Sequence, residues 1–307
     1  MIKISQILLV NILIMLNGNL LFADSLKEIA NNKSSAIINP FDKDQEVQAK
    51  CFGWSKKDWY VSDVSGEIQI SDKWQIKDHY VAIDKVPIEI PNDPEIENSD
   101  QSKKIFSVDD GYLISFYAGE WGGSLWWFSK DGKSKKAILP YDKSMQGFWH
   151  AKSFVNEFMP TNEGLYLLVG LSHLSLDRGG ILKLERTKDK GWQIAKFIDL
   201  DSAAYEYYQI DQNSYLILTG KKVVRFSVEG VSRTLYEPIN GYYLSGVGGN
   251  SIVQDSAGNI YIGNRYKVSK LMPISGGYRE EWIIPEYCEW DVESNAVCHC
   301  KNGEDGT

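Results

Sequence analysis

The sequence lacks the short motifs by which many enzymes are recognised. It contains no G-x-S-x-G, no H-E-x-x-H and no P-loop, and the glycines from Gly246 have no strand-to-helix context in which they could hold a phosphate. Its four histidines are His79, His150, His173 and His299, spread singly along the chain. A single histidine more often serves packing than chemistry. We therefore expect no catalytic residue on the strength of a motif.

Positive charge is also scarce. The chain holds 33 Lys and Arg against 41 Asp and Glu, a formal net charge of −8. The lysines that lie close together, in residues 133–136 and 188–190, fit two solvated hairpin tips rather than a continuous basic stripe. Because nucleic acids present dense rows of phosphate, this composition argues against a nucleic-acid partner.

No unbroken apolar run long enough to span a bilayer follows residue 23. Residues 1–23 combine a cation at Lys3, an apolar run and small residues up to Ala23, which is typical of a secretory signal peptide. Asn11 and Asn17 interrupt the run, so cleavage is favoured over retention as an anchor. We expect a periplasmic or secreted protein without stable membrane insertion.

Cysteine is limited to Cys51, Cys288, Cys298 and Cys300. An even number in an exported chain favours disulfides. Only one residue separates Cys298 from Cys300, which would strain a bond between them, so the expected pairings join Cys51 to one of the three C-terminal cysteines. A metal site using these thiols and His299 is the alternative, although zinc sites usually space paired cysteines by two to four residues. We expect no cofactor, with a divalent metal left open.

The chain does contain a repeated theme. A turn with an acidic or amide residue and a small partner precedes a short apolar strand, and a second strand then ends in a polar turn. Four instances align on Gly111, Gly164, Ser214 and Gly258, about 50 residues apart. A period of this length is typical of stacked or radial repeats.

The strands of the repeat are apolar on both faces. In "YLILTG", residues 215–220, successive apolar side chains point to opposite sides of the strand, and "LYLLVG" and "SLWWF" share this property. The segments between them are too short for crossover helices, so the strands must pair in antiparallel hairpins. The pattern predicts small antiparallel sheets covered on both faces by similar sheets.

This pattern resembles the β-propeller superfamily. The resemblance covers residues 105–285 and is carried by "GNIYIG" at 258–263, "GLYL" at 164–167 and the related pieces at 123–128 and 180–184. No WD dipeptide or kelch signature is present. The resemblance implies an all-β, propeller-like fold of five antiparallel blades, with a sixth left open.

Domain boundaries follow from the same repeat. After the signal peptide we expect a short leader or arm at 24–50, a single propeller-like domain at 51–300 and a flexible tail at 301–307. A less regular blade is expected at 59–83, and the proline-containing stretch 86–104 is expected to form an exposed loop.

Three aromatic groups are candidates for ligand contact. In the first, an indole lies beside a carboxylate in a glycine-rich turn, an arrangement that can hold a sugar or an extended peptide. The six candidate ligand-binding residues are Glu120, Trp121, Trp149, His150, Tyr207 and Tyr208. Packing at strand edges is the alternative for each group. Because propeller loops open onto one end of a central channel, the resemblance implies that the groups line one end.

These features favour a non-catalytic binding module for a glycan, peptide or protein partner in the cell envelope. One alternative is a metal-assisted hydrolase or lactonase-like propeller enzyme, for which Glu120, Asn156, Glu157 and Asn213 could supply polar groups. Another alternative is a periplasmic inhibitor or immunity-type protein, which would use the same loop face against another protein.

Overall fold

The regular elements in the described part of the chain are all β-strands. The computed structural model describes residues 36–38, 58–72, 87–90, 96, 102–117, 123–139, 154–173, 176–189, 191–230, 232–237, 251–264, 267–284, 288–291 and 297–300. Within these ranges no helix occurs, and hence none that is long and apolar enough to cross a membrane. This confirms the predicted all-β class.

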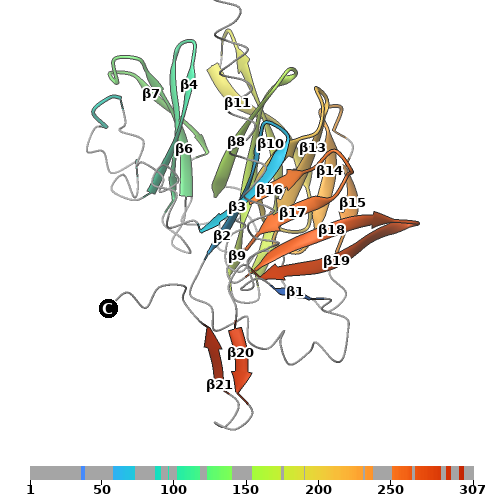
Figure 1. Ribbon diagram of the computed structural model, residues 1–307. Coiled ribbons are helices and arrows are strands. Elements are labelled where there is room, and N and C mark those ends of the chain that lie inside the picture. Colours follow the sequence, from blue (N-terminus) through green and yellow to red (C-terminus); the bar gives the residue numbers. More distant parts are fainter. Residues whose placement is uncertain are drawn as a thin grey trace, which may run out of the picture.

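Four sheets share one design, in which four strands follow one another as an antiparallel meander (Figure 1). The first sheet contains β4 (Ser102–Val108), β5 (Gly111–Tyr117), β6 (Gly123–Ser129) and β7 (Lys135–Leu139). The second contains β8 (Val155–Thr161), β9 (Gly164–His173), β10 (Leu176–Thr187) and β11 (Gly191–Asp199). The third contains β12 (Ala204–Gln209), β13 (Ser214–Thr219), β14 (Val223–Ser227) and β15 (Ser232–Tyr236). The fourth contains β16 (Ser251–Gln254), β17 (Ile260–Gly263), β18 (Val268–Ile274) and β19 (Gly277–Ile284).

Two hairpins and one short strand complete the set. The hairpins are β2 (Trp59–Val64) with β3 (Glu67–Asp72), and β20 (Cys288–Asp291) with β21 (Val297–Cys300). The short strand β1 (Ala36–Ile38) pairs antiparallel with β19 and becomes the outermost strand of the fourth sheet. A segment from early in the chain thus extends a sheet formed late in the chain.

The strands are apolar on both faces because each sheet is covered on both sides. Along β13, Tyr215 and Ile217 pack into the core between the second and third sheets. Leu216 and Leu218 point the other way, into the core between the third and fourth sheets. All four are buried, and burying a side chain of this size contributes about 2 kcal/mol relative to leaving it exposed. This confirms the packing predicted from the sequence.

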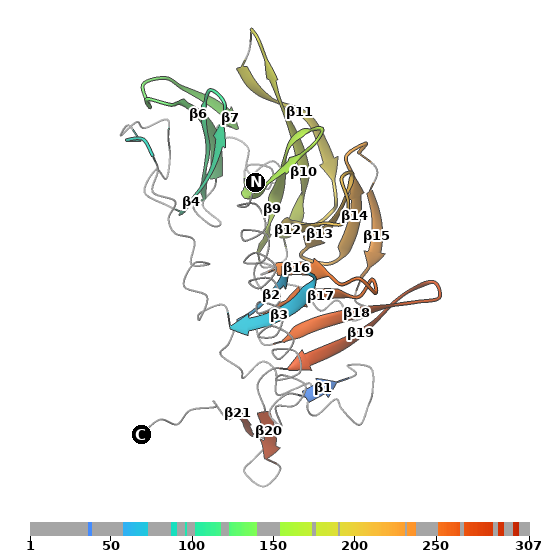
Figure 2. The ribbon, with the colours of Figure 1, turned by 45° about the horizontal axis from the view of Figure 1, so that its top comes forward.

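The sheets lie side by side around an axis, with the first strand of each sheet innermost (Figures 1 and 2). Successive contacts join β4 to β8, β8 to β12, β12 to β16, and β16 to β2. The hairpin β2–β3 therefore lies beside the fourth sheet, where the Trp59 amide donates to the Asn264 carbonyl (3.0 Å) and the Val61 amide donates to Ser251 Oγ (2.8 Å).

This arrangement is a β-propeller-like fold of four complete blades, with β2–β3 as a two-stranded fifth unit. Each sheet keeps its own edges, since none closes into a barrel. The predicted irregular blade at 59–83 corresponds to β2–β3, and its residues 73–83 lie outside the described part of the chain.

One local expectation is wrong. Residues 86–104 do not form a wholly exposed loop, because Ile96 is buried and Ile88 and Ile90 pack against the first sheet. Strand β4 already begins at Ser102. The prolines interrupt the strand pattern. The isoleucines beside them nevertheless cover an apolar face of the first sheet that would otherwise be exposed to water.

Candidate functional site

The meander topology gives the ring two different ends. One end carries the connections from each sheet to the next and the turns between second and third strands, and we call it the connection end. The other carries the remaining turns, and we call it the turn end. Glu120, Trp121, Trp149 and His150 lie outside the described residues. The described strand ends that flank these positions are the end of β5, the start of β6 and the start of β8. All three lie at the connection end.

Tyr207 and Tyr208 lie within the inner strand β12 rather than in a loop before an inner strand. As neighbours in a strand they point to opposite sides. The Tyr207 ring packs against Tyr215, with centroids 6.1 Å apart, and the Tyr208 hydroxyl donates to Asp63 Oδ2 at 3.1 Å. The two tyrosines therefore do not share one ligand face. Burial raises the pKa of both, so both hydroxyls stay protonated at neutral pH.

The inner strands of the first three sheets and strand β2 of the hairpin β2–β3 carry a group of polar side chains that we call the axial cluster: Tyr60, Lys104, Glu157, Glu206 and Tyr207. Lys104 Nζ forms an ion pair with Glu157 Oε2. Burial raises the pKa of Tyr60 and Tyr207, and the charges of Glu157 and Glu206 raise both further. Both carboxylates therefore act on both phenols. These strands thus carry hydroxyl donors, carboxylate acceptors and an ammonium group, and the carboxylates act electrostatically on both phenols.

The residues considered for a hydrolase do not form one set. Asn156 bridges two sheets, because its Nδ2 donates to the carbonyls of Gly170 (3.0 Å) and Ala204 (2.8 Å). Glu157 belongs to the axial cluster, whereas Asn213 lies at the turn end and accepts from Asn162 Nδ2 at 2.8 Å. Among the described residues, no three His, Cys, Asp or Glu side chains come together in a way that could hold a metal ion.

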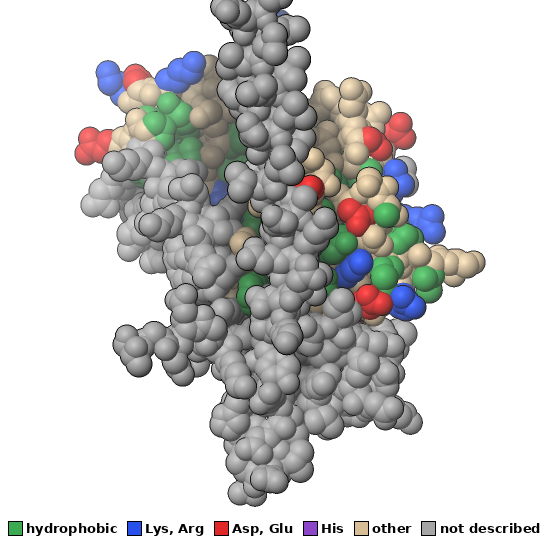
Figure 3. All heavy atoms as spheres, in the orientation of Figure 1, with side chains coloured by type: hydrophobic (Ala, Val, Ile, Leu, Met, Phe, Trp, Pro, Cys, Tyr) green, Lys and Arg blue, Asp and Glu red, His purple; other side chains and the backbone are tan. Residues whose placement is uncertain are grey.

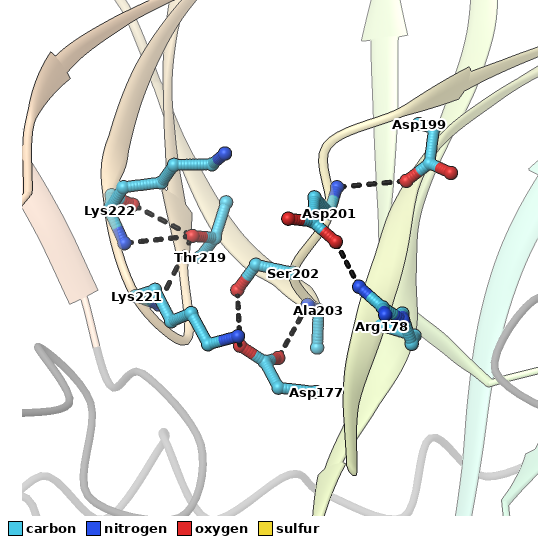
Figure 4. A network of polar contacts seen from close by, with 9 residues as sticks. All are labelled: Asp177, Arg178, Asp199, Asp201, Ser202, Ala203, Thr219, Lys221 and Lys222. Carbon is cyan, nitrogen blue, oxygen red and sulfur yellow. Dashed lines mark hydrogen bonds and ion pairs between the residues drawn. The ribbon is translucent and has the colours of Figure 1, made fainter. Parts of the chain in front are cut away.

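A buried carboxylate joins the second and third sheets at the connection end (Figure 4). Asp177 is 5% exposed; its Oδ2 accepts from Ser202 Oγ (2.8 Å) and its Oδ1 from the Ala203 amide (2.9 Å). Lys221 Nζ lies 3.4 Å from Oδ2. One side chain thus ties β10, the connection before β12 and the turn after β13. Sequence reasoning missed it, because its partners are distant in the chain.

Glycines allow the close approach at this junction. Gly170 has φ +142°, and a Cβ there would lie 2.5 Å from the Ala203 Cα. A Cβ on Gly179 would lie 2.8 Å from the same atom. The second sheet can therefore meet the start of the third only where it carries no side chain.

A second buried network joins β15 of the third sheet to β19 of the fourth. Glu280, 4% exposed, accepts from Tyr236 Oη (2.7 Å) and from Trp282 Nε1 (2.7 Å). Lys267 Nζ lies 3.7 Å from Glu280 Oε1 and 3.5 Å from the Trp282 ring centroid. Burial lowers the pKa of Lys267 to about 8, against the opposing effect of Glu280. This network also had no signal in the sequence.

A pocket opens at the turn end between the second and third sheets. Its volume is about 460 Å³, and its lining residues are Pro160, Thr161, Asn162, Gln209, Gln212 and Tyr215. They come from the end of β8 and the turn after it, the end of β12, the turn before β13 and β13 itself. None of the six carries a charge.

The predicted cysteine pairing is not tested, because Cys51 lies outside the described residues. In the hairpin β20–β21, the register places Cys288 opposite Cys300 and Cys298 opposite Trp290. The link between Cys51 and the C-terminal cysteines stays a prediction.

Charges of both signs alternate over the described part of the face shown in Figure 3. Lys and Arg side chains occur singly or in pairs beside Asp and Glu side chains on the visible sheets. Over the described residues, this face therefore has no large patch of only positive or only negative charge.

No protein-family model matches the chain, and no curated protein matches it. Among solved structures, the extracellular domain of a hybrid two component system from B. thetaiotaomicron is 20% identical, with a TM-score of 0.36, covering 77% of this chain and 26% of that chain. Virginiamycin B lyase from Staphylococcus aureus is 11% identical, with a TM-score of 0.31, covering 87% and 73%. The N-terminal domain of Nup159 is 13% identical, with a TM-score of 0.34, covering 78% and 68%. The chain spans about a quarter of the length of the extracellular domain that it matches.

Proposed function

We propose that this protein is an exported, non-catalytic binding module that takes a glycan, peptide or protein ligand on the axis of the ring. The observation that supports this most is the axial cluster. The cores between the sheets are largely apolar, whereas Tyr60, Lys104, Glu157, Glu206 and Tyr207 are polar groups on the inner strands of three sheets and on β2 of the hairpin β2–β3. A rigid scaffold that presents a few convergent polar groups is the usual form of a ligand site.

The proposed site extends toward the connection end. Glu120, Trp121, Trp149 and His150 belong to segments whose described flanks lie at that end, and we propose that they form an aromatic rim around the axial cluster. An indole face covers apolar ligand surface while the carboxylate accepts hydrogen bonds, so the rim would supply affinity and the cluster would supply orientation.

The test begins with capture of ligands from envelope extract by the mature protein, followed by titration of the captured compound. Glu157→Gln and Glu206→Gln keep the side-chain shape but remove the charge, and together they should weaken binding at least tenfold. Trp121→Ala should also weaken it while leaving the melting temperature nearly unchanged. Asp131→Asn, at an exposed hairpin tip, is the matched control.

Two outcomes would contradict the proposal. The first is a double variant that folds and binds the captured ligand as tightly as the unaltered protein. The second is a stoichiometric divalent metal in the purified protein together with turnover of the ligand, which would favour the metal-assisted hydrolase instead.

A further inference from the structure

The pocket at the turn end has a lining unlike the axial cluster. Three of its six lining residues carry carboxamides, namely Asn162, Gln209 and Gln212, and two carry hydroxyls. The pocket volume of about 460 Å³ lies within the range of small-molecule sites. An uncharged lining gains little from binding an ion but can hydrogen-bond many neutral polar groups.

Tyr215 places a phenol hydroxyl at this pocket. Its ring is buried in the core between the second and third sheets, and the residue lines the pocket. Its hydroxyl makes no hydrogen bond to any described residue, whereas the neighbouring Tyr166 hydroxyl donates to the Val228 carbonyl at 2.9 Å. A phenol hydroxyl at a pocket wall that has no protein partner is available to donate to a ligand and to accept from it.

The pocket carboxamides are only partly used within the protein. Asn162 Nδ2 donates to Asn213 Oδ1 at 2.8 Å, and Gln209 Nε2 donates to the Asp211 carbonyl at 3.2 Å. These two bonds fix the side chains and leave their oxygens as acceptors. Gln212 makes no side-chain hydrogen bond to a described residue, so both its donor and its acceptor are available.

We infer that this pocket binds a neutral polyhydroxylated ligand, a saccharide of one or two residues. Each sugar hydroxyl is both donor and acceptor, and it therefore matches a lining that alternates carboxamide acceptors with amide and phenol donors. Burial, together with Asp211 and Tyr166, raises the pKa of Tyr215, so its hydroxyl remains a donor at neutral pH.

This inference goes beyond the proposed function, since it concerns another end of the ring and other residues. Tyr207 is the structural link between the two sites: it belongs to the axial cluster, and its ring packs against Tyr215. The two sites can nevertheless fail independently, because Glu157 and Glu206 do not line the pocket.

The experiment is ligand-observed saturation-transfer NMR on the mature protein, followed by titration. The probes are glucose, galactose, mannose, N-acetylglucosamine, maltose and cellobiose, with glucuronate and glucosamine as charged counterparts. At least one neutral sugar should bind in a saturable way, and more tightly than the charged sugars. The axial variant Glu157→Gln should bind that sugar unchanged.

Two pocket variants identify the site. Tyr215→Phe removes only the hydroxyl, and Gln212→Ala truncates an exposed side chain, so each should fold and each should weaken sugar binding about tenfold. Tyr166→Phe is the matched control, because it removes a phenol hydroxyl that already has a protein partner. Absence of saturable binding by every neutral probe, or equal binding by both pocket variants and the unaltered protein, would overturn the inference.

Discussion

Tyr236 donates a hydrogen bond of 2.7 Å to Glu280 and thereby joins β15 of the third sheet to β19 of the fourth. The same carboxylate accepts from Trp282 Nε1 and faces the ammonium of Lys267. A buried carboxylate needs such partners, since removing it from water is costly. The third and fourth sheets are thus joined by hydrogen bonds and an ion pair to Glu280 as well as by apolar contacts.

Lys267 should make the stability of the protein depend on pH. Burial lowers its pKa from 10.5 to about 8 in the folded protein. Between pH 8 and 10.5 the unfolded chain holds more protons on this group than the folded one, so the free energy of unfolding should rise with pH in that window. We expect a gain of about 1 to 2 kcal/mol between pH 7.5 and 9.5, measured by urea denaturation. Lys267→Met should lack the rise, and an identical profile in both proteins would contradict the assignment.

Loss of the Asp177 carboxylate should destabilise the junction between the second and third sheets. Asp177→Ala leaves the Ala203 amide, the Ser202 hydroxyl and Lys221 without their shared acceptor, which should cost about 3 kcal/mol. Asp131→Ala, at an exposed hairpin tip, should have a much smaller effect on stability. Chemical denaturation at pH 7 measures both, and equal effects would show that Asp177 is not an essential link.

A methyl group added at Gly170 should be strongly unfavourable. The new Cβ would overlap the Ala203 backbone, and the residue would keep a φ of +142° that L side chains rarely adopt. We expect a loss of more than about 2 kcal/mol and a lower melting temperature. Gly277→Ala is the control, because nothing lies within 4 Å of its added Cβ. A Gly170→Ala protein as stable as this control would refute the close approach.

Peptide mapping without reductant should find Cys51 bonded to one of the C-terminal cysteines. The expected partner is Cys288, Cys298 or Cys300. Such a long loop would stabilise the fold by about 4 to 5 kcal/mol in the entropic model. A free thiol at Cys51 would disprove the pairing.

The sequence predicted the blades better than the polar sites. Strands such as β13 can be recognised in the sequence because their side chains are apolar on both faces of the strand. The inner strand β12 was missed as a strand because it faces the axis and mixes glutamate with tyrosine, which gives no clear period. The partners that Asp177 and Glu280 find in the neighbouring sheet lie 25 to 44 residues away along the chain, so no local pattern could identify these links between sheets.

The hydrogen bond from the Trp59 amide to the Asn264 carbonyl determines when, during synthesis, the hairpin β2–β3 can pack. Trp59 is synthesised more than two hundred residues before its partner, so the hairpin β2–β3 must wait with its apolar face uncovered until the fourth sheet exists. Contacts this distant along the chain make folding slow. A nascent chain stalled before Asn264 would therefore hold three blades and an unmatched end, open to chaperones and proteases.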